Sequence, residues 1–270
     1  MTITDYDVRS LYLELLRRNL TRFGMHERMP SDWPLRRRLL LKAANTFGPK
    51  LRGARRDQNL REVGLDWPAE AETMIGMKRL TSLQQCVETA LADDVPGDLV
   101  ETGVWRGGAC ILMRAVLAAY GDRTRNVWLC DSFQGVPRSD TENYKADKGI
   151  HAEIVSGILG VSEADVRRNF ERYGLLDDQV RFLPGWFKDT LHDAPIDAIA
   201  VLRLDGDLYE STIQALDALY PRLSPGGFCV VDDYLAVKAC EQAVTDYRNR
   251  HGITEEIVDI DGTGVLWRKR

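Results

Sequence analysis

Apolar residues near the start of the chain recur at helical spacing. Over residues 7–22 they predict an amphipathic helix with one apolar face. We expect this face to carry Leu11, Leu15, Leu16 and Leu20. Residues 35–46 predict a second helix of the same kind.

From about residue 70, helical patterns alternate with short apolar strands. A helix is predicted within 69–92, and further helices at 108–121, 161–174 and 211–224, with a short one after residue 185. Strands are predicted at 98–103, 126–131, 179–185, 198–207 and 226–234. The alternation predicts an α/β fold with a doubly wound, largely parallel sheet. Asp-Gly-Thr-Gly joins segments 254–260 and 261–270 and predicts a closing hairpin with an antiparallel strand.

The chain shows no internal repeat and no low-complexity linker. The simplest division is therefore an N-terminal helical extension over 1–69 and one domain over 70–270. A long polar connection at 134–157 is either a loop that covers the substrate or an unstructured link.

No apolar run reaches the roughly 20 residues that span a bilayer. The chain begins with MTITDYDVRS, which has acids where a signal peptide has positive charge. We therefore expect a cytoplasmic protein without membrane contacts. The five cysteines form no CxxC pair, which favours reduced and buried thiols. The four histidines lack zinc-site spacing, so a bound metal would need carboxylate ligands.

Charge is distributed unevenly along the chain. The whole sequence has 36 Lys and Arg against 41 Asp and Glu, a net charge of −5. Residues 1–61 hold 14 basic and 6 acidic residues, a balance of +8, which leaves −13 for the remainder. A basic segment on an acidic body is compatible with nucleic acid, an anionic partner surface or self-association.

A glycine-rich turn follows the first predicted strand, at the sheet edge where ligands of such folds bind. Its sequence is ETGVWRGG, from Glu101 and Thr102 to Gly108. Gly103 and Gly107 allow a tight turn and a close approach of a ligand to the backbone. A GxGxxG dinucleotide motif would have glycine in place of Trp105. The ExGxxxGG form is instead typical of S-adenosylmethionine sites, although a turn without a ligand is the alternative.

The second predicted strand ends in Asp131, followed by Ser132 and Phe133. An acid at this position can accept hydrogen bonds from both ribose hydroxyls of an adenosine. The alternative is a helix N-cap, a position that favours Asp and Ser.

Four carboxylates follow the fourth and fifth predicted strands. Because the ends of neighbouring strands lie about 5 Å apart, Asp205, Asp232 and Asp233 should converge and repel one another. A hard divalent cation, magnesium in the first place, would relieve this repulsion. We interpret Asp207 as the N-cap of the next helix. Trp105, Trp186 and Phe187 also follow strands and either wall a cavity or belong to the core.

Four motifs together resemble the macrocin O-methyltransferase family, from about residue 70 to the C-terminus. They are ETGVWRGG (101–108), DSFQG (131–135), LDGDLYEST (204–212) and VVDDY (230–234), with TMIGMKRL (73–80) upstream. The resemblance implies a class I methyltransferase sheet of seven strands. It also implies an enzyme that depends on S-adenosylmethionine and Mg²⁺ and methylates sugar hydroxyls of macrolide and aminocoumarin antibiotics.

The resemblance also implies roles for individual residues. Asp205, Asp232 and Asp233 match the metal triad of the family, and Asp205 would also be the catalytic base. Thr73 to Gly76, including Met74, would lie over the cofactor. The other residues expected to bind it are Glu101, Thr102, Gly103, Asp131, Ser132 and Phe133. The N-terminal region would form oligomer contacts and part of the substrate cavity, so we expect a homodimer or a higher homo-oligomer.

We therefore expect an O-methyltransferase that acts on a small-molecule glycoside. A catechol-type O-methyltransferase is the alternative within the same enzyme class, since it also uses carboxylates, a metal and vicinal hydroxyls. A module that binds adenosylmethionine without catalysis is the alternative of another class, and the complete carboxylate set speaks against it. The acidic body and the absence of an NPPY-type motif disfavour a nucleic-acid substrate.

Overall fold

The computed structural model describes residues 7–25, 31, 33–51, 60–151 and 156–270. Its centre is a seven-stranded sheet in the order β3-β2-β1-β4-β5-β7-β6. The strands are β1 (Asp98–Thr102), β2 (Val127–Asp131), β3 (Val180–Pro184), β4 (Ile199–Leu204), β5 (Leu223–Val231), β6 (Val258–Asp259) and β7 (Val265–Arg268). Strands β1 to β5 are parallel, and β7 is antiparallel to both of its neighbours. The predicted doubly wound sheet with an antiparallel last strand is confirmed.

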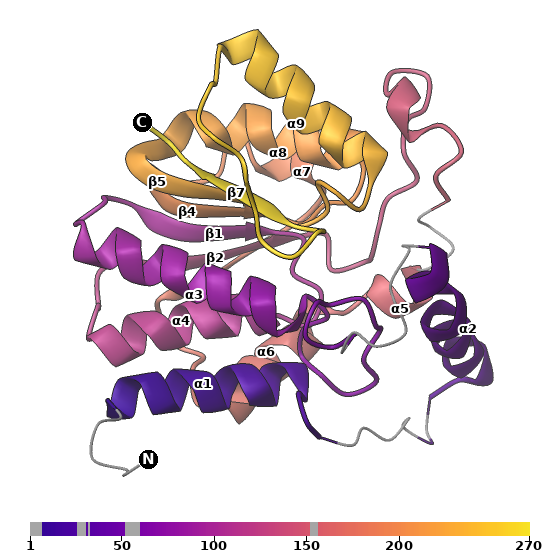
Figure 1. Ribbon diagram of the computed structural model, residues 1–270, viewed down its shortest axis with the longest axis horizontal. Helices are drawn as coiled ribbons and strands as arrows, with labels where there is room; N and C mark the ends of the chain where they lie inside the picture. Colours follow the sequence, from indigo (N-terminus) through magenta and orange to yellow (C-terminus); the bar gives the residue numbers. More distant parts are fainter. Residues whose placement is uncertain (1–6, 26–30, 32, 52–59, 152–155) are drawn as a thin grey trace.

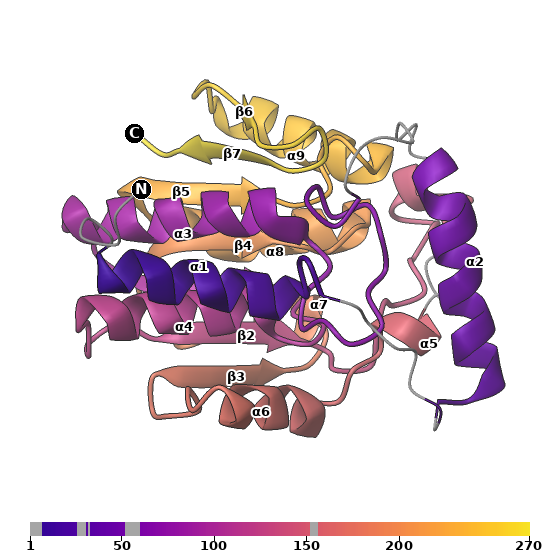
Figure 2. The same cartoon turned by 60° about the horizontal axis from the view of Figure 1, so that its bottom comes forward.

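Helices cover both faces of the sheet (Figure 1). One face carries α1 (Val8–Thr21), α3 (Gly76–Ala92), α4 (Gly108–Tyr120) and α6 (Glu163–Arg172). The other carries α7 (Phe187–Thr190), α8 (Tyr209–Leu219) and α9 (Lys238–His251). Figure 2 shows α2 (Leu35–Leu51) and α5 (Ser156–Leu159) beyond the carboxyl ends of the parallel strands. These two helices therefore lie at the edge of the sheet where the candidate site residues were predicted.

The two large core clusters lie one on each face of the sheet, and a small third cluster includes residues of α2 and α5. Successive residues of a strand point to opposite faces, so Leu99 and Val201 join the cluster under α3 and α4. Their neighbours Val100 and Leu202 join the cluster under α8 and α9. Because both faces are covered, the central strands β1 and β4 are buried along almost their whole length.

The predicted apolar face of α1 was partly wrong. Leu16 and Leu20 are buried as expected, and Leu13 is buried with them, whereas Leu11 and Leu15 are 43% and 65% exposed. The helix packs against α3 and α4, and the buried side chains of Leu13, Leu16 and Leu20 belong to their core cluster. Leu11 and Leu15 lie on a second apolar stripe of the same helix, which faces outward.

Helix α9 was not predicted. Its sequence, KACEQAVTDYRNRH, has low apolar content, and small residues predominate among its buried apolar side chains. Its buried apolar side chains are Ala239, Cys240, Ala243, Val244 and Tyr247. The chain also places all five cysteines in buried positions as free thiols, as expected.

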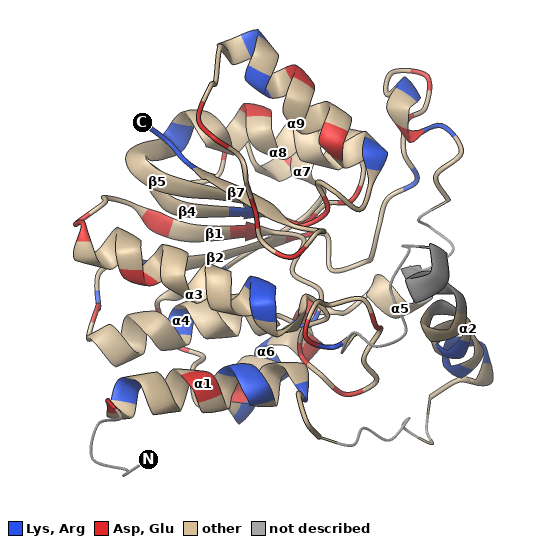
Figure 3. Cartoon of the chain, in the orientation of Figure 1, with Lys and Arg blue, Asp and Glu red and all other residues tan. Residues whose placement is uncertain are grey.

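The N-terminal segment contacts the body of the protein through α1, which adds Leu13, Leu16 and Leu20 to the core cluster of α3 and α4. Figure 3 shows Lys and Arg on α1 and α2. The division at residue 69 and the oligomer contacts stay predictions. Within the described part of the chain, no helix is both long and apolar enough to cross a membrane.

Candidate active site

A cavity of about 530 Å³ lies at the carboxyl ends of the parallel strands. Most of the predicted site residues line it, namely Thr73, Met74, Glu101, Gly103, Asp131, Ser132, Asp205, Asp232 and Asp233. Two predicted cofactor residues do not. The Thr102 side chain is fully buried, and the Phe133 ring packs against Phe182 at 5.9 Å between ring centroids. The sheet thus brings together residues that are up to 160 positions apart in the sequence.

Gly103 brings the end of β1 close to the end of β4. Its φ is +84°, and a Cβ atom at this position would lie 1.8 Å from the carbonyl oxygen of Asp205. The amide of Asp205 in turn donates to the carbonyl oxygen of Thr102 at 2.9 Å. The glycine turn and the first acid of the predicted metal triad are therefore in direct backbone contact.

Replacing Gly103 with alanine is expected to destabilise the protein by about 4 kcal/mol or more, because the clash is with backbone and cannot be relieved by a side-chain rotation. Gly121 is the matched control, since its φ is +73° but nothing lies within 4 Å of a Cβ there. Gly121→Ala should cost only about 1 kcal/mol of backbone strain. Urea denaturation of both variants measures the difference, and equal losses would contradict the close contact.

Asp131 links the turn that follows β1 to the turn that follows β2. Its carboxylate accepts the amide N–H of Val104 at 2.6 Å and that of Phe133 at 2.7 Å. Burial raises its pKa, while these hydrogen bonds oppose the rise. No helix begins between residues 132 and 144, all of which are described, so the N-cap alternative is excluded. Asp131 also lines the cavity.

The segment before α3 lies against the glycine-rich turn. The amide of Gly108, the first residue of α4, donates to the carbonyl oxygen of Glu72 at 3.0 Å. A Cβ atom on Gly108 would lie 2.7 Å from that oxygen and from Cβ of Thr73. This close packing places Thr73 and Met74 beside the turn, where the resemblance to the family had placed them.

Asp205, Asp232 and Asp233 meet in the cavity as predicted. Each offers a carboxylate oxygen, and these oxygens lie within 4.8 Å of one another. Asp205 follows β4, and the other two follow β5, the neighbouring strand. Within the described ranges, this is the one group of three or more potential ligand side chains at such distances.

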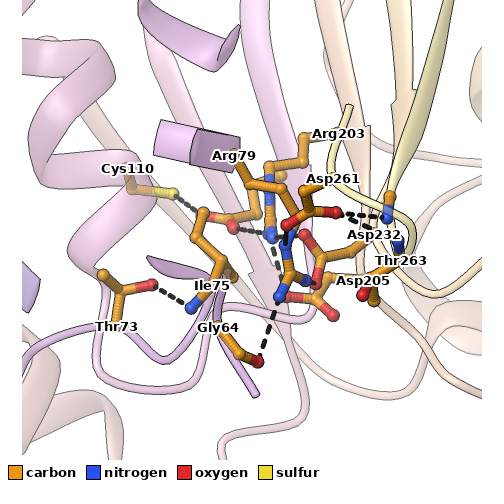
Figure 4. A network of polar contacts seen from close by, with 12 residues as sticks. Gly64, Thr73, Ile75, Arg79, Cys110, Arg203, Asp205, Asp232, Asp261 and Thr263 are labelled. Carbon is orange, nitrogen blue, oxygen red and sulfur yellow. Dashed lines mark hydrogen bonds and ion pairs between the residues drawn. The ribbon is translucent and has the colours of Figure 1, made fainter. Parts of the chain in front are cut away.

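Two buried arginines that the sequence interpretation missed lie beneath these acids (Figure 4). Arg203, on β4, is 1% exposed and forms ion pairs with Glu101, Asp205 and Asp232. Its distances to Asp205 and Asp232 are 2.9 and 2.5 Å. Arg79, on α3, pairs with Asp232 and, at 3.0 Å, with Asp261. One feature of the sequence could have indicated Arg203. It is a charged residue inside an apolar strand, and it lies two residues before Asp205, which places both side chains on the same face of the sheet.

A model of the macrocin O-methyltransferase family matches residues 9–269. The chain belongs to this family. The match reaches residue 9 and so includes α1 and α2, well before residue 70, where the quoted motifs begin. The protein is therefore a methyltransferase with a class I sheet.

Relatives with assigned activities cover nearly the whole chain. One relative is the 8-demethyl-8-(2,3-dimethoxy-α-L-rhamnosyl)-tetracenomycin-C 4'-O-methyltransferase of Streptomyces olivaceus. The two sequences are 54% identical over 262 residues, and the alignment covers 97% of this chain and 94% of the relative. This chain is 51% identical over 261 residues to the mycinamicin III 3''-O-methyltransferase of Micromonospora griseorubida, 96% of each protein. The solved structure of the O-methyltransferase NovP aligns with a TM-score of 0.83 at 48% identity, over 97% of this chain and 99% of that one.

The donor set of the acidic cluster fits a hard divalent cation. Oδ2 of Asp233 is buried and has no hydrogen-bond partner among the described residues. Burial, then repulsion by Asp207 and Asp232, raises the pKa of Asp233 to about 8. The five carboxylates of Glu101, Asp205, Asp232, Asp233 and Asp261 face two guanidiniums, which leaves a formal charge of −3. The two arginines thus reduce the repulsion among the carboxylates but do not neutralise them, and a bound cation would add the missing positive charge.

The interpretation of Asp207 as a helix N-cap was wrong. Leu208 is the N-cap residue of α8, and its side chain makes no capping hydrogen bond. The cap comes from Asp147, 62 residues away in sequence, which accepts the amide N–H groups of Tyr209 and Glu210. Asp207 itself has a φ of +57° and lines the cavity.

Aromatic side chains wall the cavity, as one of the two interpretations of Trp105, Trp186 and Phe187 expected. Trp67, which was not singled out, joins them. The indole N–H of Trp105 donates to the carbonyl oxygen of Ile158 at 3.1 Å, so this ring also ties α5 to the glycine-rich turn. Of the predicted loop 134–157, residues 135–138 line the cavity and residues 152–155 lie outside the described part.

Proposed function

We propose that this family member uses S-adenosylmethionine and Mg²⁺ to methylate a sugar hydroxyl of a glycosylated natural product, as part of antibiotic biosynthesis. The observation that carries the proposal is the convergence of Asp205, Asp232 and Asp233 in one cavity with the glycine-rich turn of β1 and with Asp131. The name of the Streptomyces olivaceus relative supports a glycoside as acceptor, because it describes 4'-O-methylation of a rhamnosyl derivative of tetracenomycin C.

The cofactor would occupy the side of the cavity formed by β1, β2 and the segment before α3. The turn at Gly103, with Glu101 beside it, would bind the amino-acid part of the cofactor, and the Asp131 carboxylate would accept hydrogen bonds from the ribose. Thr73 and Met74 would cover this side of the cavity. Thr102, Ser132 and Phe133 would contribute through the backbone of the same two turns.

Asp205, Asp232 and Asp233 would hold the metal ion through one oxygen each. When bound, magnesium supplies positive charge beside the reacting hydroxyl, and S-adenosylmethionine supplies a methyl group on a positively charged sulfur. Both would bring positive charge to a network that carries an excess of carboxylates.

Asp205 would accept the proton of the acceptor hydroxyl. Its side chain is 26% exposed, into the cavity, whereas the side chain of Asp232 is 5% exposed and both of its oxygens contact arginines. Burial, followed by repulsion from Asp232, raises the pKa of Asp205 well above its usual range, and Arg203 opposes this rise. A raised pKa makes a carboxylate a stronger base, which suits proton removal from a weakly acidic hydroxyl.

Chelation of divalent cations with EDTA is expected to lower methyl transfer by about 100-fold or more, and excess Mg²⁺ should restore it. The assay uses labelled S-adenosylmethionine with a panel of rhamnosyl and other deoxysugar glycosides, and with catechols as the competing acceptor class. EDTA already saturated with Mg²⁺ is the control. Full activity in EDTA would contradict metal dependence.

The same panel separates the other functions. Methylation of catechols without glycosides would assign the catechol-type activity, and cofactor binding without transfer to any acceptor would assign a non-catalytic module. We also propose assembly into a homodimer or higher homo-oligomer without nucleic acid as a partner, on the strength of the family resemblance of the N-terminal region.

A further inference from the structure

Two segments far apart in the sequence line the cavity without belonging to the cofactor turns or to the acidic cluster. One is the loop from Gly135 to Arg138 after β2, and the other consists of Glu210, Ser211 and Gln214 in the first turns of α8. We call these residues together the acceptor wall. Helix α8 begins only four residues after Asp205, so its first turns and the proposed base belong to one continuous stretch of chain.

Asp147 joins the two halves of this wall. It is fully buried, and its carboxylate accepts the amide N–H of Tyr209 at 2.7 Å and that of Glu210 at 3.0 Å. These are free N–H groups of the first turn of α8, which its own N-cap residue leaves unsatisfied. The same carboxylate accepts the hydroxyl of Ser139 at 2.7 Å. Ser139 directly follows Arg138, so one side chain binds the end of the loop half and the start of the helical half.

Glu210 makes the reciprocal contact. Its carboxylate accepts the amide N–H of Asp140 at 2.9 Å and the hydroxyl of Ser139 at 3.2 Å. The rings of Tyr144 and Tyr209 also pack together, with their centroids 6.1 Å apart. The loop is therefore held to α8 through Ser139, Asp140, Tyr144 and Asp147, and the Asp147 carboxylate is the buried one among these contacts.

We propose that Asp147 is a positioning residue for acceptor binding. It does not line the cavity and touches no reacting group, but it fixes the loop from 135 to 138 against α8 and so sets the shape of the acceptor wall. This inference rests on the proposed function, because it assumes that the glycoside binds at the acceptor wall. The cofactor side, with Gly103, Asp131 and Thr73, contacts neither Asp147 nor Ser139 through any hydrogen bond described above.

Asp147→Ala is expected to raise the KM for a rhamnosyl glycoside acceptor by about tenfold or more, because small misplacements of a binding wall are costly. The Kd for S-adenosylhomocysteine, measured by calorimetry, should change by less than about twofold. Asp147→Asn should fall between wild type and alanine, since asparagine also accepts a backbone N–H at helix caps. Glu142→Gln is the matched control, an exposed charge change on the same loop. Equal losses of cofactor and acceptor binding would overturn the proposal.

Hydrogen exchange of the same proteins, each with S-adenosylhomocysteine bound, tests the positioning without any acceptor. In Asp147→Ala we expect faster exchange at the amides of Tyr209 and Glu210 and also across 135–141, with wild-type exchange at Val104 and Phe133. Unchanged exchange over 135–141 would show that the loop is placed by other contacts and would overturn the proposal. If wild type methylates no glycoside, the proposed function fails, while the exchange data still decide whether Asp147 holds the wall.

Discussion

Replacing Asp205 with asparagine is expected to lower kcat by about 10²- to 10⁴-fold, the range that a single general base contributes. The amide keeps the shape of the side chain and can still accept the hydrogen bond that Arg203 donates at 2.9 Å. It cannot accept a proton from the acceptor hydroxyl and is a weaker ligand for a hard cation. The fold should therefore remain while turnover is lost.

Single-turnover methyl transfer at saturating S-adenosylmethionine and Mg²⁺ measures this loss, and calorimetry with S-adenosylhomocysteine verifies that the cofactor side is intact. Asp197→Asn is the control, since Asp197 is an exposed acid just before the other end of the same strand. Normal turnover of Asp205→Asn at neutral pH would rule out the base assignment.

Replacing Arg203 with leucine is expected to destabilise the protein by about 3–5 kcal/mol, the cost of removing one partner from a buried ion pair. Arg203 is 1% exposed and contacts Glu101, Asp205 and Asp232 at once. Without it, these carboxylates would lose their common cation. Burial already raises the pKa of Glu101, and the attraction of Arg203 is the main effect that opposes the rise. The variant should therefore hold Glu101 as the neutral acid over a wider pH range.

Urea denaturation followed by circular dichroism measures the loss of stability. Arg203→Lys should lie between wild type and leucine, because lysine keeps the charge but cannot bridge three carboxylates with a planar fork. Arg181→Leu is the control on β3, the strand at the edge of the sheet, where the side chain is exposed. A loss below about 1 kcal/mol for Arg203→Leu would show that the carboxylates are neutralised by other means.

The acids of the site could be predicted from the sequence, whereas Arg203 could not. Residues that follow strands in an α/β sheet must meet at one edge, so Asp131, Asp205, Asp232 and Asp233 could be assigned from their positions after apolar runs. No such positional rule predicts the role of a charged residue that lies inside an apolar strand. Its burial is tolerated only because carboxylates from β1 and β5 reach it, and that depends on which strands are neighbours.

The same reasoning applies to the two helix features that were wrong or missed. The N-cap of α8 was assigned to Asp207 because local sequence favoured it, but the cap is supplied by Asp147 from a distant loop. For α1, both apolar stripes have helical spacing, and only the position of α3 and α4 selects Leu13, Leu16 and Leu20 over Leu11 and Leu15.

The sequence by itself determined the α/β class, the antiparallel last strand, the glycine-rich turn and the acids that end the strands, because each depends on local periodicity or on position relative to a strand. Only the tertiary structure decided which cations neutralise these acids, which residue caps α8 and which face of α1 is buried. These depend on contacts between segments distant in sequence, and the same local pattern permits several of them until the packing of strands and helices selects one.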